Sequence, residues 1–322
     1  MFIGYYRFQS YLKLSRAPFS QFCITAIPKN LFGSVKPQVG NIEIIDTTPD
    51  SITLQAMVNV TNPTPYSATV PYVSVHLFSN GSLVGEAWAR DLEVKQGKNT
   101  DLVVSATWRP AMGGEEGRRK GRDMISRYLS GFNGTEMVVR THGGSIPAKP
   151  ELGEALSRLN MTIEAPKIRM PGDDGDGDGD DNGGGKPGDG GGDGDDDNDK
   201  SVHFIRDATF HVLSSTATFT LVSPLTRNTI YLDRVNATAL YNHTEPIGRI
   251  LYDLPFAAPP GVSQTPKLPV EWSLDSVGYE KLKEALGGRL KLDARATVGV
   301  RIGRWTEEVW YVGKGIGAFV RI

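Results

Sequence analysis

The sequence predicts an all-β protein built from two related β-sandwich modules in tandem. Short runs in which apolar and polar residues alternate with period two recur along the chain, and turn residues separate them. Few stretches have the spacing of a helix, which favours a sandwich for each module. The same order of landmarks also appears twice, about 160 residues apart, so we interpret the second half as a degenerate copy of the first.

Four pairs of residues define this repeat. Each pair ends a strand, forms a turn or follows one: Asn62 and Ser223, Asn80 and Asn242, Gly85 and Gly248, and Trp108 and Trp272, at offsets of 161, 162, 163 and 164. Beyond each tryptophan come a short helix-like stretch, a glycine and one more strand. A near-constant offset is hard to obtain by chance, so the pattern predicts architecture and leaves the chemistry open.

The first module is predicted at 41–148, after an irregular segment at 1–40 that prolines and glycines interrupt. Its elements are expected, in order, as strands at 42–46, 52–61, 70–78, 83–89 and 101–108, a glycine- and arginine-rich loop at 113–121, a short helix near 122–130 and a strand near 135–141. A connector at 149–171 is expected to be helical at 150–159 and extended at 160–170, where the strand suits either module.

Residues 172–200 form an acidic tract that is predicted to be disordered. Between 172 and 199 it has twelve Gly, twelve Asp and one basic residue, Lys186, and therefore a charge of −11. The remainder of the chain then carries about +9, since the total is −2. A segment of this composition cannot bury enough apolar surface to order itself.

The second module is predicted at 201–322. Its clearest strand is 290–302, where seven apolar residues from Leu290 to Ile302 alternate with polar residues or glycine. The helix expected before it, at 276–286, has helical spacing in Tyr279, Leu282 and Leu286.

Two segments match known binding motifs only in part. Asp174, Asp176 and Asp178, followed by Gly179, match the start of an EF-hand loop, but its twelfth position is Gly185 instead of the bidentate Glu. The Gly313–Gly317 run looks like a phosphate-binding loop, but a strand follows it where a helix N-terminus is required. We therefore predict no metal site and no cofactor.

No residue is nominated for catalysis either. The histidines are scattered without metal-ligand spacing: His76, His142, His203, His211 and His243. His76 alternates with the apolar positions of strand 70–78, so it is predicted to be a surface histidine. The single cysteine, Cys23, has no base nearby in the sequence. The basic run Arg118–Arg122 is interpreted as a solvated loop, with contact to phosphates or lipid head groups as the alternative. The sequence thus predicts a protein that is not an enzyme.

Acceptor sites for N-glycosylation are unusually frequent. They are Asn59, Asn80, Asn133, Asn160, Asn236 and Asn242, where average composition would give roughly one or two. Asn59 and Asn236 fall on the face opposite the apolar residues of their strands, which predicts exposure. These sites indicate a secretory or vacuolar lumen. The N-terminus has no apolar run long enough for a signal peptide or a membrane span, so this interpretation implies a fragment, or a gene model that begins too late.

The run Met57–Pro71, which contains Asn62-Pro63-Thr64-Pro65, has Asn80-Gly81 and Gly85 downstream. This pattern resembles the β module of late-embryogenesis-abundant group 14 and water-stress-response proteins, where proline and Asn-Gly make the turns. The whole of 41–322, ending in Trp310–Gly315, resembles the C-terminal lumenal region of a fungal vacuolar membrane family. That family is associated with termination of autophagy, and its members are often labelled pre-rRNA processing proteins.

This resemblance implies immunoglobulin-like sandwiches on the lumenal side of the vacuolar membrane and no catalytic residues. It also implies an N-terminal transmembrane helix, which this chain lacks. The predicted function is therefore that of a non-enzymatic interaction or structural protein of the vacuolar membrane, with an unknown protein partner, acting in termination of autophagy. Three alternatives stay open: a lipid-binding module with an acyl chain between its sheets, a nuclear pre-rRNA processing factor, and an enzyme whose site is assembled in space. The six acceptor sites argue against a nucleic-acid partner.

Overall fold

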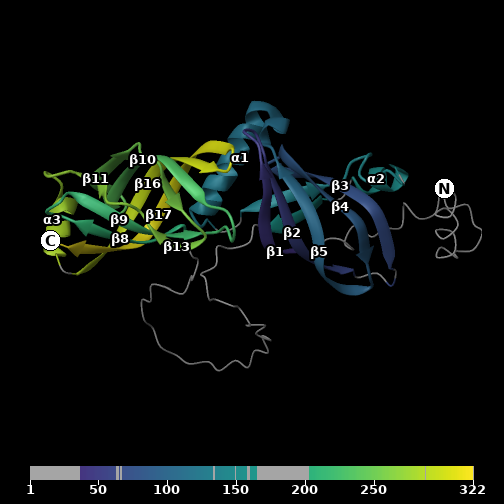
Figure 1. The fold of residues 1–322 in the computed structure, drawn as a ribbon, viewed down its shortest axis with the longest axis horizontal. Coiled ribbons are helices and arrows are strands. Elements are labelled where there is room, and N and C mark those ends of the chain that lie inside the picture. The colour runs from purple at the N-terminus through teal and green to yellow at the C-terminus, as the bar shows by residue number, and fades with distance from the viewer. Residues whose placement is uncertain are drawn as a thin grey trace, which may run out of the picture.

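The computed structural model describes residues 37–62, 65, 67–132, 135–148, 150–157, 160–164, 203–286 and 288–321. They form two β modules that follow each other along the long axis of the molecule (Figure 1). The fold is mostly strand, as the alternating sequence pattern predicts, and both modules carry a helix beside the sheet. The acidic tract and Cys23 lie outside the described residues.

The first module is a seven-stranded sheet. Its strands are β1 (Gln38–Thr47), β2 (Ile52–Asn62), β3 (Ala68–Ser79), β4 (Ser82–Val94), β5 (Gly97–Trp108), β6 (Glu136–Arg140) and β7 (Asn160–Glu164). The spatial order is β1-β2-β5-β4-β3-β6-β7, and neighbouring strands are antiparallel. The strand expected at 160–170, which the sequence left between the two modules, is β7, and its pairing with β6 assigns it to the first sheet.

The helices of the first module differ from the prediction at one place. A 3-10 turn, η1 (Pro110–Gly113), leads directly into α1 (Gly114–Leu129), and α2 (Pro150–Leu156) comes later. Residues 114–121 are therefore helical, whereas the sequence predicted a loop over 113–121 and a helix only near 122–130. Glycine disfavours helix interiors by about 1 kcal/mol, which is why the segment looks like a loop. Packing of Gly117 and Gly121 outweighs that cost, as described below.

The second module is a ten-stranded sheet. Its strands are β8 (Ile205–His211), β9 (Thr216–Ser223), β10 (Ile230–Tyr241), β11 (Glu245–Tyr252), β12 (Phe256–Ala258), β13 (Gly261–Gln264), β14 (Leu268–Pro269), β15 (Glu271–Trp272), β16 (Arg289–Ile302) and β17 (Trp305–Arg321). The main path runs β13-β9-β8-β17-β16-β10-β11-β15, with β17 and β8 parallel. Helix α3 (Val277–Glu284) begins at Ser276, whose hydroxyl accepts a hydrogen bond from the Tyr279 N–H.

The two sheets have the same circular order of strands but are opened at different places. The repeat landmarks match β8, β9, β10, β11, β15, β16 and β17 with β1 to β7 in turn. In the first sheet the pairing between β7 and β1 is absent from the described ladder, whereas its counterpart, β17 with β8, is present in the second. In the second sheet the break lies instead between β9 and β15, where β13 and β14 cover the edge of β9. The tandem inferred from sequence is thus a repeat of topology.

The turn residues of the repeat adopt the conformations that their types favour. Asn80 and Gly81 join β3 to β4 with φ of 45° and 82°, and Asn242 and His243 join β10 to β11 with φ of 47° and 68°. Positive φ is accessible to glycine and asparagine at low cost, so these residues fix both hairpins at matching positions.

The buried residues form two clusters. One lies at the far end of the second module, between β8, β11, β16 and α3. The larger one crosses from one module to the other, and it joins Trp108 and Val84 of the first sheet to Trp305 and Tyr311 of the second. The modules therefore share a hydrophobic core, so the region between them is the place to look for a site.

Candidate functional site

Helix α1 of the first module covers an edge of β17 in the second. Strand β17 pairs with β16 along most of its length but with β8 only at Gly317–Arg321. The Ser126 hydroxyl accepts a hydrogen bond from the Trp310 N–H at 3.0 Å, and the Ser130 hydroxyl accepts one from the Val312 N–H at 2.9 Å. Four residues of helix and two of strand both span roughly 6–7 Å, so the two hydroxyls match alternate strand amides. The helix thereby satisfies donors of an otherwise open edge.

Two glycines hold α1 tightly against its own module. A Cβ at Gly117 would lie 2.3 Å from the carbonyl oxygen of Pro110 and 2.9 Å from that of Leu83. A Cβ at Gly121 would lie 2.6 Å from the Pro110 ring and 3.2 Å from Trp108. Only glycine allows this approach, and it fixes which face of α1 points to the second module.

Strand β1 makes the other contact between the modules. The Arg304 backbone N–H donates to the Thr47 hydroxyl and the Arg304 Nε donates to the Thr47 carbonyl, both at 2.9 Å. Gly303 precedes Arg304 in a left-handed conformation, with φ of 56°. An ion pair between Arg227 and Glu43 adds to this side. The modules are therefore joined through α1 on one side and β1 on the other.

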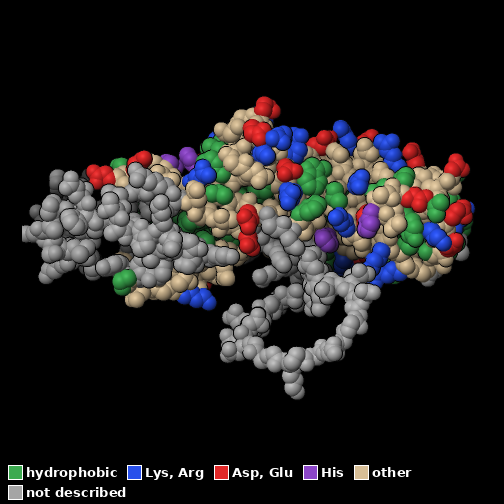
Figure 2. Space-filling view, turned by 180° about the vertical axis from the view of Figure 1, so that it is seen from behind, with side chains coloured by type: hydrophobic (Ala, Val, Ile, Leu, Met, Phe, Trp, Pro, Cys, Tyr) green, Lys and Arg blue, Asp and Glu red, His purple; other side chains and the backbone are tan. Residues whose placement is uncertain are grey.

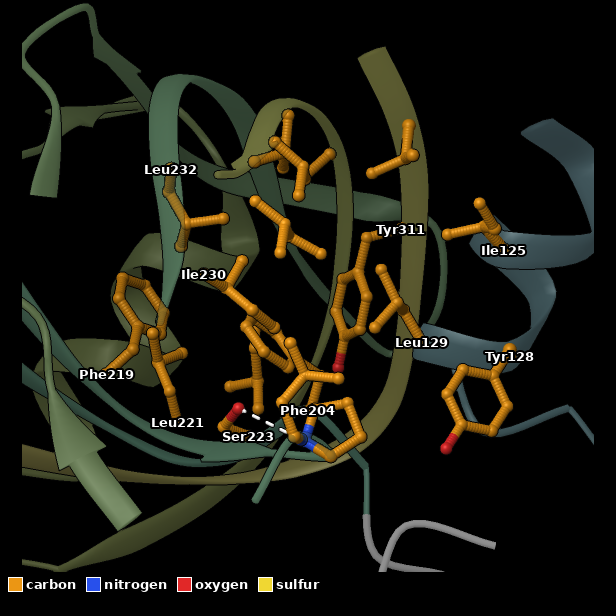
Figure 3. A pocket seen from close by; sticks show the side chains of 18 of the residues that line it. Ile125, Tyr128, Leu129, Phe204, Phe219, Leu221, Ser223, Ile230, Leu232 and Tyr311 are labelled. Carbon is orange, nitrogen blue, oxygen red and sulfur yellow. Dashed lines mark hydrogen bonds between the residues drawn. The ribbon is translucent and has the colours of Figure 1, made fainter. Parts of the chain in front are cut away.

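A partly open cavity of about 950 Å³ lies between these contacts. Helix α1 contributes Ile125, Tyr128 and Leu129, and the second module contributes Phe204, Leu221 and Tyr311, all of which are labelled in Figure 3. The strand β1 contributes Val39, Ile42 and Ile44, and Glu164 at the end of β7 also lines the space. The cavity thus reaches the place where the edge strands of the first sheet, β1 and β7, do not pair over their described residues.

Two features keep this space open: small side chains on β16, and the missing pairing between β1 and β7 in the described sheet. Ala294, Ala296 and Val298 of β16 lie along the lining, where larger side chains would fill the cavity. The volume is at the upper end of the roughly 300–1,000 Å³ that ligand pockets usually have.

Some polar groups of the lining are paired within the protein, whereas the Trp108 indole N–H and the Tyr311 hydroxyl are buried without a hydrogen-bond partner among the described residues. The Ser223 hydroxyl accepts a hydrogen bond from the Leu225 N–H at 3.2 Å, which Figure 3 marks with a dashed line. Burial raises the pKa of Tyr128 to about 12 and raises the pKa of Tyr311 as well, so both hydroxyls keep their protons near neutral pH. Because most of the residues that line the cavity are apolar, the cavity suits hydrocarbon.

The predicted glycosylation sites are spread over the surface. Asn80, Asn160, Asn236 and Asn242 are exposed. Asn59 is half-buried, and its side-chain oxygen accepts a hydrogen bond from the Asp101 N–H at 3.0 Å. Asn133 lies outside the described residues. Glycosylation stays a prediction at all six.

The basic run Arg118–Arg122, predicted as a solvated loop, is part of helix α1. Its three arginines are exposed, and two of them are paired. Arg119 forms an ion pair with Glu116 at 2.6 Å, and Arg122 forms one with Glu307 at 2.9 Å. Figure 2 shows basic and acidic side chains interspersed on the visible face of the molecule. This arrangement does not concentrate positive charge for a polyanion.

The other candidate motifs do not come together. In the described part of the chain, no group of three or more His, Cys, Asp or Glu is placed to hold a metal ion. The EF-hand-like aspartates from Asp174 to Asp178 lie outside the described residues. The Gly313–Gly317 run is part of β17, which continues through it, so its backbone is not a phosphate-binding loop. Among the described helices, none has the length and apolarity to span a membrane.

The histidines include a pair that the sequence did not reveal. His76 is half-buried, and its ring stacks on that of His142 with centroids 4.2 Å apart, whereas the sequence predicted a surface histidine. The two residues are far apart in the sequence and no motif links them. His203 lies beside the carbonyl oxygen of Ser130 at 3.3 Å, and His243 pairs with Asp293 at 2.6 Å.

Comparison with protein families supports the resemblance seen in the sequence. Residues 35–154 match the model described as Tag1-like fourth LEA-2 like domain, and residues 197–310 match the Tag1-like fifth LEA-2 like domain. None of the curated proteins compared with the chain matches it. The two matches fall in order on the two β modules and together cover most of the chain. The protein therefore belongs to the Tag1-like family, of which it carries the fourth and fifth LEA-2 like domains in tandem.

Proposed function

We propose that the protein is a non-enzymatic, lumen-facing component of the vacuolar membrane that holds the hydrocarbon part of a lipid in the cavity between its two modules. The cavity carries this proposal, because about 950 Å³ of space with a predominantly apolar lining persists where two modules share a core. Burial of an apolar chain there gains about 25 cal/mol for each Å² removed from water.

The cellular part of the proposal rests on the family. Tag1-like membership, with the acceptor asparagines exposed on both modules, supports a lumenal position at the vacuolar membrane and a role in termination of autophagy. Lipid binding gives this role a physical basis, since a protein that holds a membrane lipid responds to the composition of that membrane. An unidentified protein partner remains part of the proposal.

The nuclear alternative has less support. A ribosomal RNA partner would require clustered cations, but Arg119 and Arg122 of the basic run are paired with carboxylates. An enzymatic function likewise finds no nominated nucleophile, base or metal set among the described residues.

Filling the cavity is expected to weaken lipid binding. Ala296 lies on the lining, so Ala296→Phe places a ring in the space that the chain would occupy. We expect binding of a fluorescent acyl lipid, measured by titration of the purified protein, to weaken at least about tenfold, which corresponds to about 1.4 kcal/mol. The matched control is Thr297→Phe, which adds the same ring at the next, exposed position of β16.

Equal lipid affinity in the Ala296→Phe and Thr297→Phe variants would contradict a ligand in this cavity. Absence of uptake by the unmodified protein would remove lipid binding from the proposal and leave the interaction role alone.

The lumenal position predicts glycosylation of the protein in cells. Treatment of the tagged protein with an endoglycosidase is expected to increase its gel mobility, because the exposed acceptor sites include Asn80 and Asn236. Changing Asn59, Asn80 and Asn236 to Gln should reduce that shift. An unshifted protein in the soluble nuclear or cytosolic fraction would contradict the vacuolar position and favour the ribosomal RNA alternative.

A further inference from the structure

Segment 141–148 closes over the part of β3 that β6 leaves uncovered. Strand β6 pairs with β3 only at His76–Phe78. Beyond that point, the Ser74 N–H donates to the carbonyl oxygen of Ser145 at 2.9 Å. Ser145 is fully buried and Ile146 is 8% exposed, so the segment is packed against the sheet. It therefore takes the place of a strand along this edge.

His142 holds the segment in place as a neutral ring of defined tautomer. Its Nδ1 accepts a hydrogen bond from the Gly144 N–H at 3.2 Å, which requires the proton to be on Nε2. Nε2 lies 3.3 Å from the Ser74 hydroxyl on β3. A second proton on the ring would occupy Nδ1 and remove the acceptor that Gly144 uses.

His76 faces this ring directly from β3. The two imidazole planes are inclined by 19° with centroids 4.2 Å apart. Burial lowers the pKa of His76, the neighbouring His142 lowers it further, and Glu86 acts in the opposite direction. Stacked neutral rings attract each other, whereas two imidazolium ions at this separation repel.

The charged groups around the pair come from three elements. Glu86 of β4 and Arg140 of β6 lie opposite His76 in the sheet. The Arg140 guanidinium is placed over the Phe78 ring, 4.8 Å from its centroid. Glu154 of α2 lies near Gly143, since a Cβ built there would be 3.3 Å from its carboxylate. Among the described residues, neither histidine of the pair has a carboxylate at ion-pair distance.

We propose that the His76–His142 stack is an acid-sensitive latch that releases segment 141–148 from β3. The released state binds more protons than the closed state, because His76 then accepts a proton without the cost of burial and away from the His142 ring. The closed state is therefore favoured above the ordinary histidine pKa and is lost as pH falls below it. The latch is independent of the cavity, which neither ring lines.

Hydrogen exchange of the Ser74 amide, measured on the full chain, tests the latch directly, because this amide bonds to Ser145 of the segment. Between about pH 7 and about pH 5, we expect the protection factor of the Ser74 amide to fall about tenfold more than that of a reference amide. The Val212 N–H, which donates to Arg321 in the second module, is a suitable reference. The variant His76→Phe keeps an aromatic ring on His142 but removes one titrating group, and should lose most of this fall.

His211→Phe is the matched control, since it removes a histidine of β8 outside the stack, and it should behave as the unmodified protein. Equal protection of Ser74 at both pH values, or the same fall in His76→Phe, would overturn the latch. If His76→Phe does not fold, nuclear magnetic resonance of the unmodified protein provides the test, by following the ring resonances of the two histidines with pH. Mutually dependent titration of His76 and His142 supports the proposal, and independent titration overturns it.

Discussion

Alanine in place of Gly117 is expected to lower the free energy of unfolding by about 1–3 kcal/mol, although alanine favours helices over glycine by about 1 kcal/mol. The added Cβ would lie 2.3 Å from the Pro110 carbonyl oxygen and 2.9 Å from that of Leu83. Both are backbone atoms, so neither can rotate away as a side chain would. Helix α1 would therefore be displaced, and chemical denaturation measures the loss.

Gly288→Ala is the control for this substitution. The nearest atom to a Cβ at Gly288 is the Ala285 carbonyl oxygen at 3.4 Å, so the change there should be small. A Gly117→Ala protein as stable as the unmodified one would show that α1 has room to shift, and that the close approach to η1 and β4 is not required.

Ser126→Ala is expected to lower the free energy of unfolding by about 1–3 kcal/mol, because it leaves the Trp310 N–H without its acceptor in a part-buried contact. Ser126 is fully buried, so water does not replace its hydroxyl easily. Hydrogen exchange of the Trp310 amide should accelerate in the same variant. Chemical denaturation and amide exchange together measure the contribution of the contact between α1 and β17.

Ser214→Ala provides the comparison, since Ser214 is exposed and its hydroxyl bonds locally to Thr216 at 2.8 Å. That change should stay within about 0.5 kcal/mol of the unmodified protein. Loss of the Ser126 hydroxyl without any change in stability or in Trp310 exchange would mean that the modules are held together by apolar packing alone.

Strands and turns could be predicted because each depends on a local pattern. Strand β16 occupies Arg289–Ile302, close to the 290–302 expected from alternation, and α3 lies within the helix expected at 276–286. Asn80-Gly81 and Asn242 mark hairpins through their own backbone preferences. Such features need no knowledge of what lies across the sheet.

Features that depend on distant partners could not be predicted. Gly117 and Gly121 make 114–121 look like a loop, and only their contact with Pro110 explains why it is helical. The alanines of β16 that line the cavity have the alternation of ordinary core residues, and sequence alone does not show that the described residues leave a cavity beside them. The partner of His76 likewise lies in another segment, 66 positions along the chain.

The cavity wall is drawn from both modules, and this has a thermodynamic consequence. A chain held there stabilises the contact between the modules, and the contact in turn raises affinity for the chain by the same factor, because the two equilibria are linked. A partner that draws α1 away from β17 would therefore release the ligand. The ligand-bound protein would in turn resist that separation. If a lipid occupies the cavity as proposed, the separation of the two LEA-2 like domains and the occupancy of the cavity change together.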